Sequence, residues 1–587
     1  IWIGAYKPRM LRLLARKADG WLPSLGYATL EQLAEGNARI DEAAEGAGRR
    51  PREIRRLLNV NGTFLNANRG FLTGPPKQWA QELAELALEQ GFGTFILSGD
   101  DPTAIQAFGE EVAPAVREIV ARERGEPAPE RPRVTRLTSG DEVPRSDDIA
   151  YDEIPASLRD EAVAPGDPAY ERVRSTYMQE GRPGLVLMAE DPEHVSEAIL
   201  FARSQPVPLS IRSGGHGALS TNDGGIIIDV SRLNGIEIVD EATRRVRVGP
   251  GATWGQVAQA LAPYGWAMTS GDAPDVGVGG IATGGGIGLL ARKFGLMIDH
   301  IVAAEVALAD GRIVRTSEDE HPDLFWAIRG AGANVGIVTA IEFEALPVRN
   351  VISGMFVLDA TDMAGVLARW GAYMEAAPRE LQNFLYLSPA RRGQPPVAQI
   401  YAVWANDDVP AATAALEPLL RVGPLIDQQA QVVPYAALMT PQNAPHAGQQ
   451  TLRGRTGLLD HLNRETADAV VRLMKEGRVP WANFRTLGGA VNDVPAGATA
   501  WAHRSQAVAF TALDLYPDLR NLDPAWQAFE PHTNGIYINL HWDTSEESVR
   551  QAYPSPTYER LQRVKTEYDP ENVFSRNFNV PPLVRVP

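Results

Sequence analysis

Residues 211–220 read IRSGGHGALS and place one histidine, His216, between Gly214, Gly215 and Gly217. A backbone almost without side chains is either a sharp turn with a solvated histidine or a surface on which a bulky ligand lies flat. A second such segment, SGDAPDVGVGGIATGGGIG, follows at residues 270–288. Main-chain N–H groups without Cβ obstruction can converge on an anion, most commonly a diphosphate. The two segments together therefore favour a bound nucleotide over a pair of structural turns.

Two common nucleotide motifs do not account for these segments. Residues 286–291, GIGLLA, fit the Rossmann pattern G-x-G-x-x-A, which requires a strand directly before its first glycine and a crossover helix after it. The preceding residues, DAPDVGVGGIATGG, are not an ordinary strand sequence. Neither segment contains the Gly-Lys-Ser/Thr of a P-loop. A nucleotide site of another kind is expected.

Composition narrows the function classes. The chain has 587 residues, a formal net charge of −17 and no cysteine. This length predicts several domains, and the negative charge disfavours nucleic acid and anionic membranes as partners. The lack of cysteine excludes disulfides, thiolate metal sites and cysteine nucleophiles. We expect a soluble, cytoplasmic protein, because no signal segment or transmembrane run is present, and no metal site, because the histidines lack ligand spacing.

Three regions differ in pattern. Residues 1–122 alternate short apolar runs with helical patterns, which predicts βα units of a parallel sheet or barrel. Residues 123–165 are charged and rich in proline without periodicity, which predicts a linker. The chain from about residue 166 predicts one large α+β unit, glycine-rich in its first half and a mixture of strands and helices from about residue 350.

Four segments of this large unit carry a resemblance to a known family: residues 208–233, 276–300, 321–343 and 568–582. In order and spacing they resemble the FAD-linked oxidases of the vanillyl-alcohol oxidase superfamily, and the berberine-bridge-enzyme-like branch fits best. The resemblance implies an α+β fold with a two-subdomain FAD-binding (PCMH-type) domain at residues 166–345. It further implies an α/β substrate-binding domain with an antiparallel sheet at residues 346–545. A C-terminal segment, residues 546–587, would return to the FAD domain.

The resemblance also implies how FAD is held. In this family the histidine of the R-x-G-G-H motif is bonded covalently to the 8α-methyl carbon of the flavin, and here that residue is His216. Many relatives attach the flavin a second time through a cysteine, but this chain has Ala273 at that position, so a single covalent bond is expected. Val276 falls where plant relatives carry a gatekeeper, and a small valine there accompanies reaction with oxygen. The implied cofactor-binding residues are Arg212, Ser213, Gly214, Gly215, His216, Gly217, Ser220, Val276, Gly277, Gly279, Gly280, Thr283, Gly284, Gly285, Gly288, Gly336, Val338, Asn577 and Asn579.

The family's Y-x-N strand suggests the catalytic residues. Residues 535–542, GIYINLHW, resemble it and place Tyr537 and Asn539 on one strand face. Tyr537 is the candidate base, and a core tyrosine is the equally weighted alternative. Its pKa, about 10 in model compounds, has to fall, or a partner has to share the proton. Ala512 and Leu513 stand where some plant members carry a catalytic glutamate, which argues against a Glu base.

Other polar and aromatic residues are candidates to line the substrate site. His503 and Arg504 could contact substrate, although a strand-end salt bridge is the more ordinary role for the arginine. Tyr401 and Trp404 lie three apart on one predicted strand, so they point to opposite faces and at most one can line the site.

Residues 1–122 resemble the C-terminal part of luciferase-like monooxygenases, which are complete eight-stranded barrels using flavin or a deazaflavin. Only three or four strands are expected here, so this partial (β/α) barrel cannot close. The piece is either part of a longer fusion, which the start at Ile1 rather than Met favours, or a remnant. No activity is assigned to it.

Together these features predict an FAD-dependent oxidase. It would remove hydride from an alcohol, such as a sugar, polyol or secondary metabolite, and pass the electrons to oxygen. A dehydrogenase with another electron acceptor is an alternative from the same class. A flavin-binding protein without turnover is the alternative from a different class.

Overall fold

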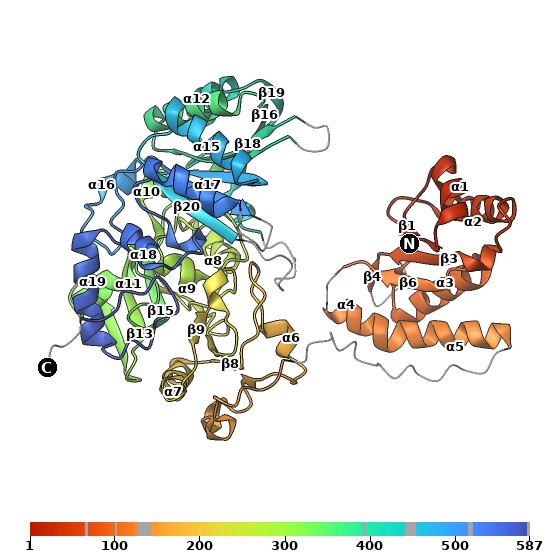
Figure 1. Ribbon diagram of the computed structural model, residues 1–587, viewed down its shortest axis with the longest axis horizontal. Coiled ribbons are helices and arrows are strands. Elements are labelled where there is room, and N and C mark those ends of the chain that lie inside the picture. Colours follow the sequence, from red (N-terminus) through yellow and green to blue (C-terminus); the bar gives the residue numbers. More distant parts are fainter. Residues whose placement is uncertain are drawn as a thin grey trace. The chain divides into compact units, whose positions relative to one another are not determined.

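The computed structural model describes residues 1–64, 69–99, 102–125, 143–390, 395–440, 453–514 and 521–583 (Figure 1). The chain divides between residues 140 and 141 into two compact units, which are described separately. Within the described residues, no helix is both long enough and apolar enough to cross a membrane.

The first unit is built from alternating strands and helices. Its main sheet has the order β1-β2-β3-β6, and every pair in it is parallel, as the alternation of apolar runs and helical patterns predicts. Leu14, Trp21 and Trp79 are among its fully buried side chains. The strands are β1 (Trp2–Ile3), β2 (Gly20–Trp21), β3 (Arg55–Val60), β4 (Thr63–Phe64), β5 (Thr73–Gly74) and β6 (Thr94–Leu97). The helices are α1 (Pro8–Lys17), α2 (Leu30–Glu45), α3 (Pro76–Glu89), α4 (Pro102–Ala107) and α5 (Ala113–Arg124).

The linker predicted at residues 123–165 is shorter than the sequence indicates. Residues 126–142 lie outside the described residues, but residues 149–164 are part of the second unit. Ile149, Ile154 and Leu158 are buried in a core that includes side chains of α7 (Pro192–Arg203). Strand β7 (Ala162–Val163) pairs with the next strand, β8. The prediction fails here because three apolar side chains in a charged segment are enough to attach it to the core, although they show no period.

Residues 143–345 of the second unit, here called the FAD-type part after the family that their sequence resembles, contain two sheets. In the first, of order β7-β8-β10-β9, the three longer strands are parallel, and the buried runs LVLM and IIID suit strands covered on both faces. The second is antiparallel, with the order β11-β12-β15-β13-β14, and contains a hairpin that turns at Ala309–Gly311. The strands are β8 (Leu185–Met188), β9 (Leu209–Arg212), β10 (Ile226–Asp229), β11 (Ile236–Asp240), β12 (Arg245–Val248), β13 (Ile301–Ala307), β14 (Ile313–Ser317) and β15 (Ile337–Glu344). The further helices are α6 (Tyr170–Val173), α8 (Trp254–Leu261), α9 (Val278–Thr283), α10 (Ala291–Phe294) and α11 (Pro322–Ile328).

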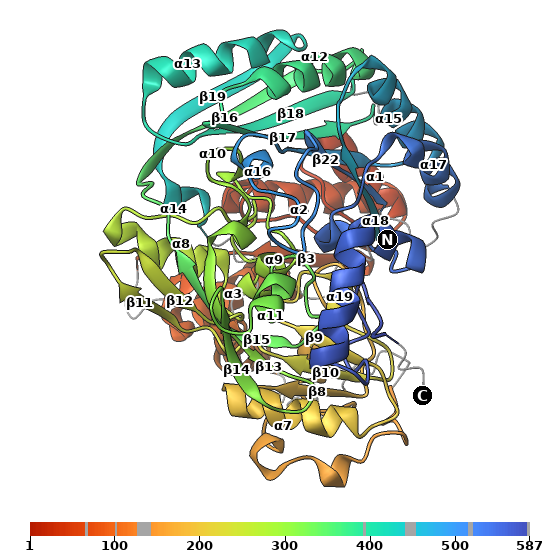
Figure 2. The same cartoon turned by 90° about the vertical axis from the view of Figure 1, so that its left-hand side faces the viewer.

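A seven-stranded antiparallel sheet forms the rest of the second unit, in the order β19-β16-β18-β17-β21-β22-β20. Alternate side chains, such as Leu385, Ile400 and Phe510, pack under a layer of helices, and the other face turns toward the FAD-type part (Figure 2). The strands are β16 (Asn350–Asp359), β17 (Leu381–Ser388), β18 (Val397–Trp404), β19 (Leu425–Pro434), β20 (Arg453–Leu459), β21 (Trp481–Thr486) and β22 (Val508–Asp514). The helices are α12 (Met363–Ala376), α13 (Val409–Leu416), α14 (Tyr435–Leu438), α15 (Arg464–Glu476), α16 (Ala490–Asp493), α17 (Leu522–Phe529), α18 (Glu546–Ala552) and α19 (Ser555–Tyr568).

The C-terminal segment runs back to the FAD-type part. Helix α19 packs against α11, and Lys565 on α19 donates hydrogen bonds to the carbonyls of Asn334 (2.7 Å) and Phe574 (2.9 Å). Its ammonium group also pairs with Asp569 at 2.7 Å, and both side chains are almost completely buried. This buried pair therefore holds residues 569–580 beside the loop that precedes β15.

Candidate active site

The two glycine-rich segments meet backbone to backbone. A Cβ atom on Gly214 would lie 2.3 Å from the backbone nitrogen of Gly277, and a Cβ atom on Gly277 would lie 2.3 Å from that of Gly214. No L side chain fits at either position without displacing the other backbone. The loop after β9 and the loop before α9 therefore form one continuous surface, and His216 belongs to it.

His216 lies against an aromatic ring that sequence reasoning missed. The ring of Tyr177 is 4.9 Å from the imidazole, centroid to centroid. The backbone N–H of Tyr177 donates a hydrogen bond to the carbonyl of Gly215 at 2.8 Å. Gly215 has a φ of +68°, which favours glycine. The His216 loop is thus held in a turn with one face of its imidazole covered. Tyr177 precedes the motif by a long interval and carries no pattern of its own.

Some of the glycines predicted to bind the cofactor are required by packing within the protein itself. A Cβ atom on Gly288 would lie 1.9 Å from the carbonyl oxygen of Ser270, and one on Gly336 would lie 2.6 Å from the side chain of Val306. At Gly280, in contrast, no atom lies within 4 Å, and this residue is exposed. Gly280 is therefore a position where the glycine surface is open to a ligand.

The remaining predicted cofactor residues lie around the same surface. Gly217 and Ser220 follow His216, and the Oγ of Ser213 accepts from the N–H of Gly214 at 2.7 Å. Thr283 donates to the carbonyl of Gly279 at 2.8 Å. Three more contribute to the hydrophobic core or to close packing beside it: Val276, Val338 and Gly285.

Arg212 has a structural role that its motif did not indicate. Its side chain is buried and pairs with the carboxylate of Asp229, which is itself buried. It also donates to the carbonyl of Val173. The guanidinium therefore ties the end of β9 to β10 and to α6, and these bonds commit it to the protein.

The short helix α9 directly precedes residues 284–290, which form a loop. A Rossmann turn would need a strand at that point. The rejection of the GIGLLA motif is therefore confirmed.

Tyr537 and Asn539 do come together, although the predicted strand is wrong. Residues 535–537 are not part of a sheet, the backbone of Tyr537 is extended, and Ile538–Leu540 form a 3₁₀ turn. The backbone N–H and carbonyl of Tyr537 bond to the hydroxyl of Thr456 on β20, at 3.0 and 3.1 Å, rather than to a strand. That side-chain pairing ends the ladder and allows the turn. The turn lets the Asn539 amide donate to the Tyr537 Oη at 3.0 Å.

The Tyr537 hydroxyl reaches the second glycine segment. The N–H of Ile287 points to it from 3.5 Å, and the ring packs edge-on against Trp501 with 5.4 Å between centroids. Asn539 lies so close to Gly284 that a Cβ atom there would be 2.1 Å from its Oδ1. Burial raises the pKa of the Tyr537 phenol, while the Asn539 hydrogen bond and the charge of Arg485 oppose that rise. The free phenol is therefore protonated at neutral pH, and it can act as a base only after it has lost this proton, which Asn539 and Arg485 favour.

A charged cluster beside Tyr537 was missed by sequence reasoning. The Asp272 carboxylate accepts a hydrogen bond from Tyr386 Oη at 2.8 Å and pairs with Arg485 at 3.1 Å. Tyr386 and Arg485 lie on the neighbouring strands β17 and β21, on the face turned toward the FAD-type part. The charged Arg485 within the mostly buried strand WANFRT is the one sequence signal that could have indicated this cluster.

Asn577 and Asn579 lie beside the loop before β15, where the Asn577 amide donates to the carbonyl of Ala333 at 2.9 Å. The Oδ1 atoms of both asparagines are buried and have no hydrogen-bond partner within the described part of the chain. Buried acceptors without donors are uncommon in proteins and are expected where a ligand supplies the donors. FAD carries such donors in its hydroxyl and ring N–H groups, so these residues and the open surface at Gly280 fit this cofactor.

The other candidates take ordinary roles. Arg504 pairs with Asp299 at 2.7 Å, which is the salt bridge considered as its alternative, and His503 is buried against the carbonyl of Ala552 at 3.0 Å. Tyr401 and Trp404 belong to different cores, as their spacing predicts, and Tyr401 is on the face turned toward the FAD-type part.

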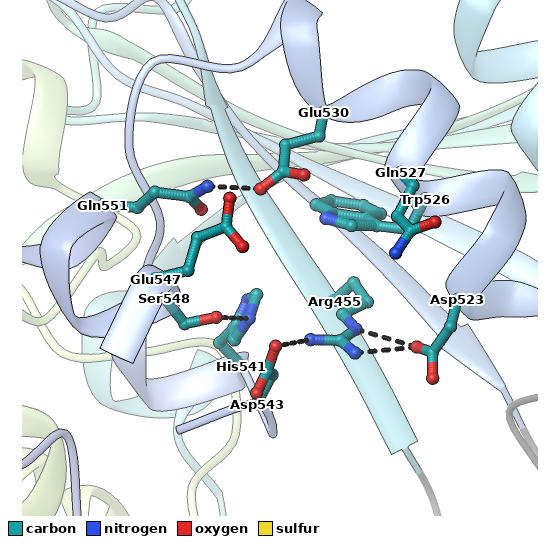
Figure 3. Close-up of a pocket in the computed structure, with 10 residues that line it drawn as sticks. All are labelled: Arg455, Asp523, Trp526, Gln527, Glu530, His541, Asp543, Glu547, Ser548 and Gln551. Atoms are coloured by element: carbon teal, nitrogen blue, oxygen red, sulfur yellow. Dashed lines mark hydrogen bonds and ion pairs between the residues drawn. The ribbon is translucent and has the colours of Figure 1, made fainter. Parts of the chain in front are cut away.

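A separate hollow of about 160 Å³ lies between β20, α17 and α18 (Figure 3). Arg455 reaches across it between Asp523, at 2.7 Å, and Asp543. The buried His541 forms its inner wall, and the imidazole Nδ1 accepts from the backbone N–H of Thr456 at 3.0 Å. Thr456 in turn holds the backbone of Tyr537. Figure 3 shows the Ser548 hydroxyl directed at the His541 imidazole, 3.4 Å from its Nε2. Its ten lining residues are Arg455, Asp523, Trp526, Gln527, Glu530, His541, Asp543, Glu547, Ser548 and Gln551.

Comparison with known families matches three parts of the chain. Residues 183–317 match an FAD binding domain, residues 536–581 match the berberine and berberine-like family, and residues 1–64 match the luciferase-like monooxygenases. His216, Gly277, Asp272, Tyr537 and Asn539 fall within the first two matches, whereas Tyr386, Thr456 and Arg485 lie between them.

The chain is also similar in sequence to known oxidases over most of their length. (R)-6-hydroxynicotine oxidase from Paenarthrobacter nicotinovorans is 30% identical over 427 residues, which are 68% of this chain and 92% of that protein. Xylooligosaccharide oxidase from Thermothelomyces thermophilus is 29% identical over 439 residues, 67% of this chain and 86% of that protein. A solved structure of glucooligosaccharide oxidase from Acremonium strictum, described with a 6-S-cysteinyl, 8α-N1-histidyl FAD, has a TM-score of 0.63. It is 22% identical and covers 72% of this chain and 98% of that one.

Proposed function

Because the chain belongs to the berberine and berberine-like family of FAD-linked oxidoreductases and is therefore an FAD-dependent enzyme, we propose that it oxidises an alcohol and passes the electrons to oxygen. We further propose that His216 holds the flavin covalently and that Tyr537 is the base. The observation that carries the proposal is the contact between Gly214 and Gly277. It joins the His216 loop to the segment that receives the side chains of Tyr537 and Asn539.

Bound FAD supplies the acceptor for a hydride, and the chain supplies position, proton transfer and electrostatics. The substrate C–H bond breaks with both electrons leaving the carbon, the O–H proton goes to the Tyr537 phenolate, and a carbonyl forms. Oxygen then takes the two electrons and two protons and becomes hydrogen peroxide. Asn539 orients the Tyr537 hydroxyl by its 3.0 Å hydrogen bond, and the positive charge of Arg485 favours the phenolate.

Covalent attachment through His216 is supported by the place of that residue in the joined glycine surface. The covered imidazole face against Tyr177 leaves the ring little freedom to rotate. Ala273 cannot form the thioether of a 6-S-cysteinyl flavin, so we propose one link where glucooligosaccharide oxidase is described with two.

The names of the relatives indicate a broad class of substrate. They are named for a hydroxynicotine and for oligosaccharides, so an alcohol in a sugar or another hydroxylated metabolite is the proposed substrate. The partly exposed polar side chains of Tyr386, Tyr401 and Asn539 favour such a compound over a purely apolar one. A dehydrogenase with another acceptor is the second candidate, because nothing in the site selects oxygen apart from the small Val276.

The first experiment is acid precipitation of the full-length protein. Yellow colour is expected to stay in the washed pellet of the wild type and to leave the pellet of His216→Ala. Colour released from both proteins would exclude the covalent link.

Two kinetic measurements test the reaction. In anaerobic stopped-flow with substrate, Tyr537→Phe is expected to lose flavin reduction by at least about a hundredfold while keeping bound FAD. Unchanged reduction would exclude Tyr537 as the base. Mixing the reduced enzyme with oxygen then separates an oxidase, which is reoxidised quickly, from a dehydrogenase.

A further inference from the structure

Asp272 connects the second glycine segment to the large antiparallel sheet. It directly precedes Ala273, and its carboxylate reaches Tyr386 on β17 and Arg485 on β21. About 24% of the Asp272 side chain and 12% of the Arg485 side chain are exposed. The pair therefore remains within reach of a small ligand, unlike the sealed pair of Lys565 and Asp569.

The pair is close enough to the catalytic tyrosine to affect its ionisation. The positive charge of Arg485 lowers the pKa of Tyr537 and the negative charge of Asp272 raises it. Tyr537 in turn reaches the N–H of Ile287 in the same glycine-rich segment that carries Asp272. A substrate whose hydroxyl reaches Tyr537 would thus have its neighbouring groups beside Asp272.

The carboxylate has hydrogen-bonding capacity left. An ionised carboxylate offers about four lone-pair directions on its two oxygens. Among the side chains of the described residues, Tyr386 and Arg485 both bond to Oδ2, whereas Oδ1 receives a bond from Arg485 alone, at 3.3 Å. The backbone N–H of Asp272 also bonds to the carboxylate. Oδ1 can therefore accept one more hydrogen bond. The cluster as a whole is neutral, since one guanidinium balances one carboxylate, so neither an anion nor a cation gains from it without breaking the ion pair.

We propose that Asp272 selects the substrate by accepting, at Oδ1, a hydrogen bond from a hydroxyl group of a neutral, hydroxyl-rich compound of the saccharide type. Arg485 balances its charge, and Tyr386 fixes its orientation. This inference rests on the proposed function, because it takes the surface beside Tyr537 as the substrate site.

Three hexoses that differ by one group test the proposal: glucose, glucuronate and glucosamine. Their dissociation constants are measured on the full-length, FAD-loaded protein from the change in flavin absorption. The wild type is expected to bind glucose most tightly. Asp272→Asn keeps the shape but leaves Arg485 unbalanced, so the ratio of glucuronate to glucose affinity should rise about tenfold or more. Arg485→Met leaves the carboxylate unbalanced and should shift the ratio toward glucosamine by a similar factor.

Asp299→Asn is the matched control. Like Asp272, Asp299 forms an ion pair with an arginine from the second half of the chain, in this case Arg504 in the segment before β22. It is expected to lower stability without changing the ranking of the three hexoses. Affinity ratios for the three hexoses that are unchanged in both test variants, or a wild-type flavin that glucose does not perturb, would overturn selection by Asp272 and leave the proposed function standing. A purified protein without FAD would overturn both.

Discussion

Protonation of His541 is expected to destabilise the second unit in mild acid. The imidazole is only 4% exposed, and burial together with the charge of Arg455 lowers its pKa from 6.5 to about 4. The folded chain therefore binds this proton only near pH 4, whereas the unfolded chain binds it below about pH 6.5. Stability is fully present above pH 6.5 and falls as the pH decreases toward 4. Linkage of these two pKa values costs about 2 kcal/mol at pH 5 relative to neutral pH.

His541→Asn isolates this contribution. Asparagine can offer its side-chain oxygen to the N–H of Thr456 near the position of Nδ1, but it does not titrate. His300 and His503, whose pKa values burial also lowers, are present in both proteins and cancel in the comparison.

The assay is urea unfolding at pH 7, 6 and 5, followed by the increase in flavin fluorescence as the unfolding protein exposes the flavin. The wild type should lose about 2 kcal/mol more than the variant between pH 7 and pH 5. Equal losses in the two proteins would refute the assignment of a neutral His541 between the hollow in Figure 3 and Thr456.

Three further changes test other parts of the structure. Lys565→Met leaves Asp569 buried without its partner and should lower the free energy of unfolding by about 3–5 kcal/mol, measured by urea unfolding; a loss below about 1 kcal/mol would contradict the burial of the pair. Gly288→Ala should prevent recovery of FAD-bound protein because its Cβ would meet the carbonyl of Ser270, whereas Gly280→Ala should fold, and equal yields would contradict the packing described. Arg485→Met should raise the pKa of Tyr537 further and move the rising limb of the pH–kcat profile to higher pH; an unmoved limb would separate Arg485 from the proton transfer.

Much of the architecture is readable in the sequence because it depends on local pattern. The apolar runs around Ile227 and Ile400 form β10 and β18, and the helical pattern of residues 363–376 forms α12. The Asp-Gly turn at residues 310–311 joins β13 to β14. The glycines around His216 and at residues 277–288 are likewise visible in short stretches of sequence. Together with the order of the other motifs, they indicate the family. The exclusion of disulfides and cysteine chemistry needs only the composition.

The chemistry of the site, in contrast, depends on contacts between residues far apart in the chain. Asp272 meets Arg485 across 213 positions, and Thr456 replaces a strand partner for Tyr537 across 81. Such pairs leave no period in the sequence, because each partner satisfies its own local pattern whichever residue it meets. The sequence by itself determined the family, the nucleotide surface and the candidate tyrosine. Only the tertiary structure decided that Arg212 is committed to Asp229, and that burial raises the pKa of Tyr537 while an arginine opposes it. The reason is that burial and charge pairing are properties of a three-dimensional neighbourhood, and chain spacing does not encode them.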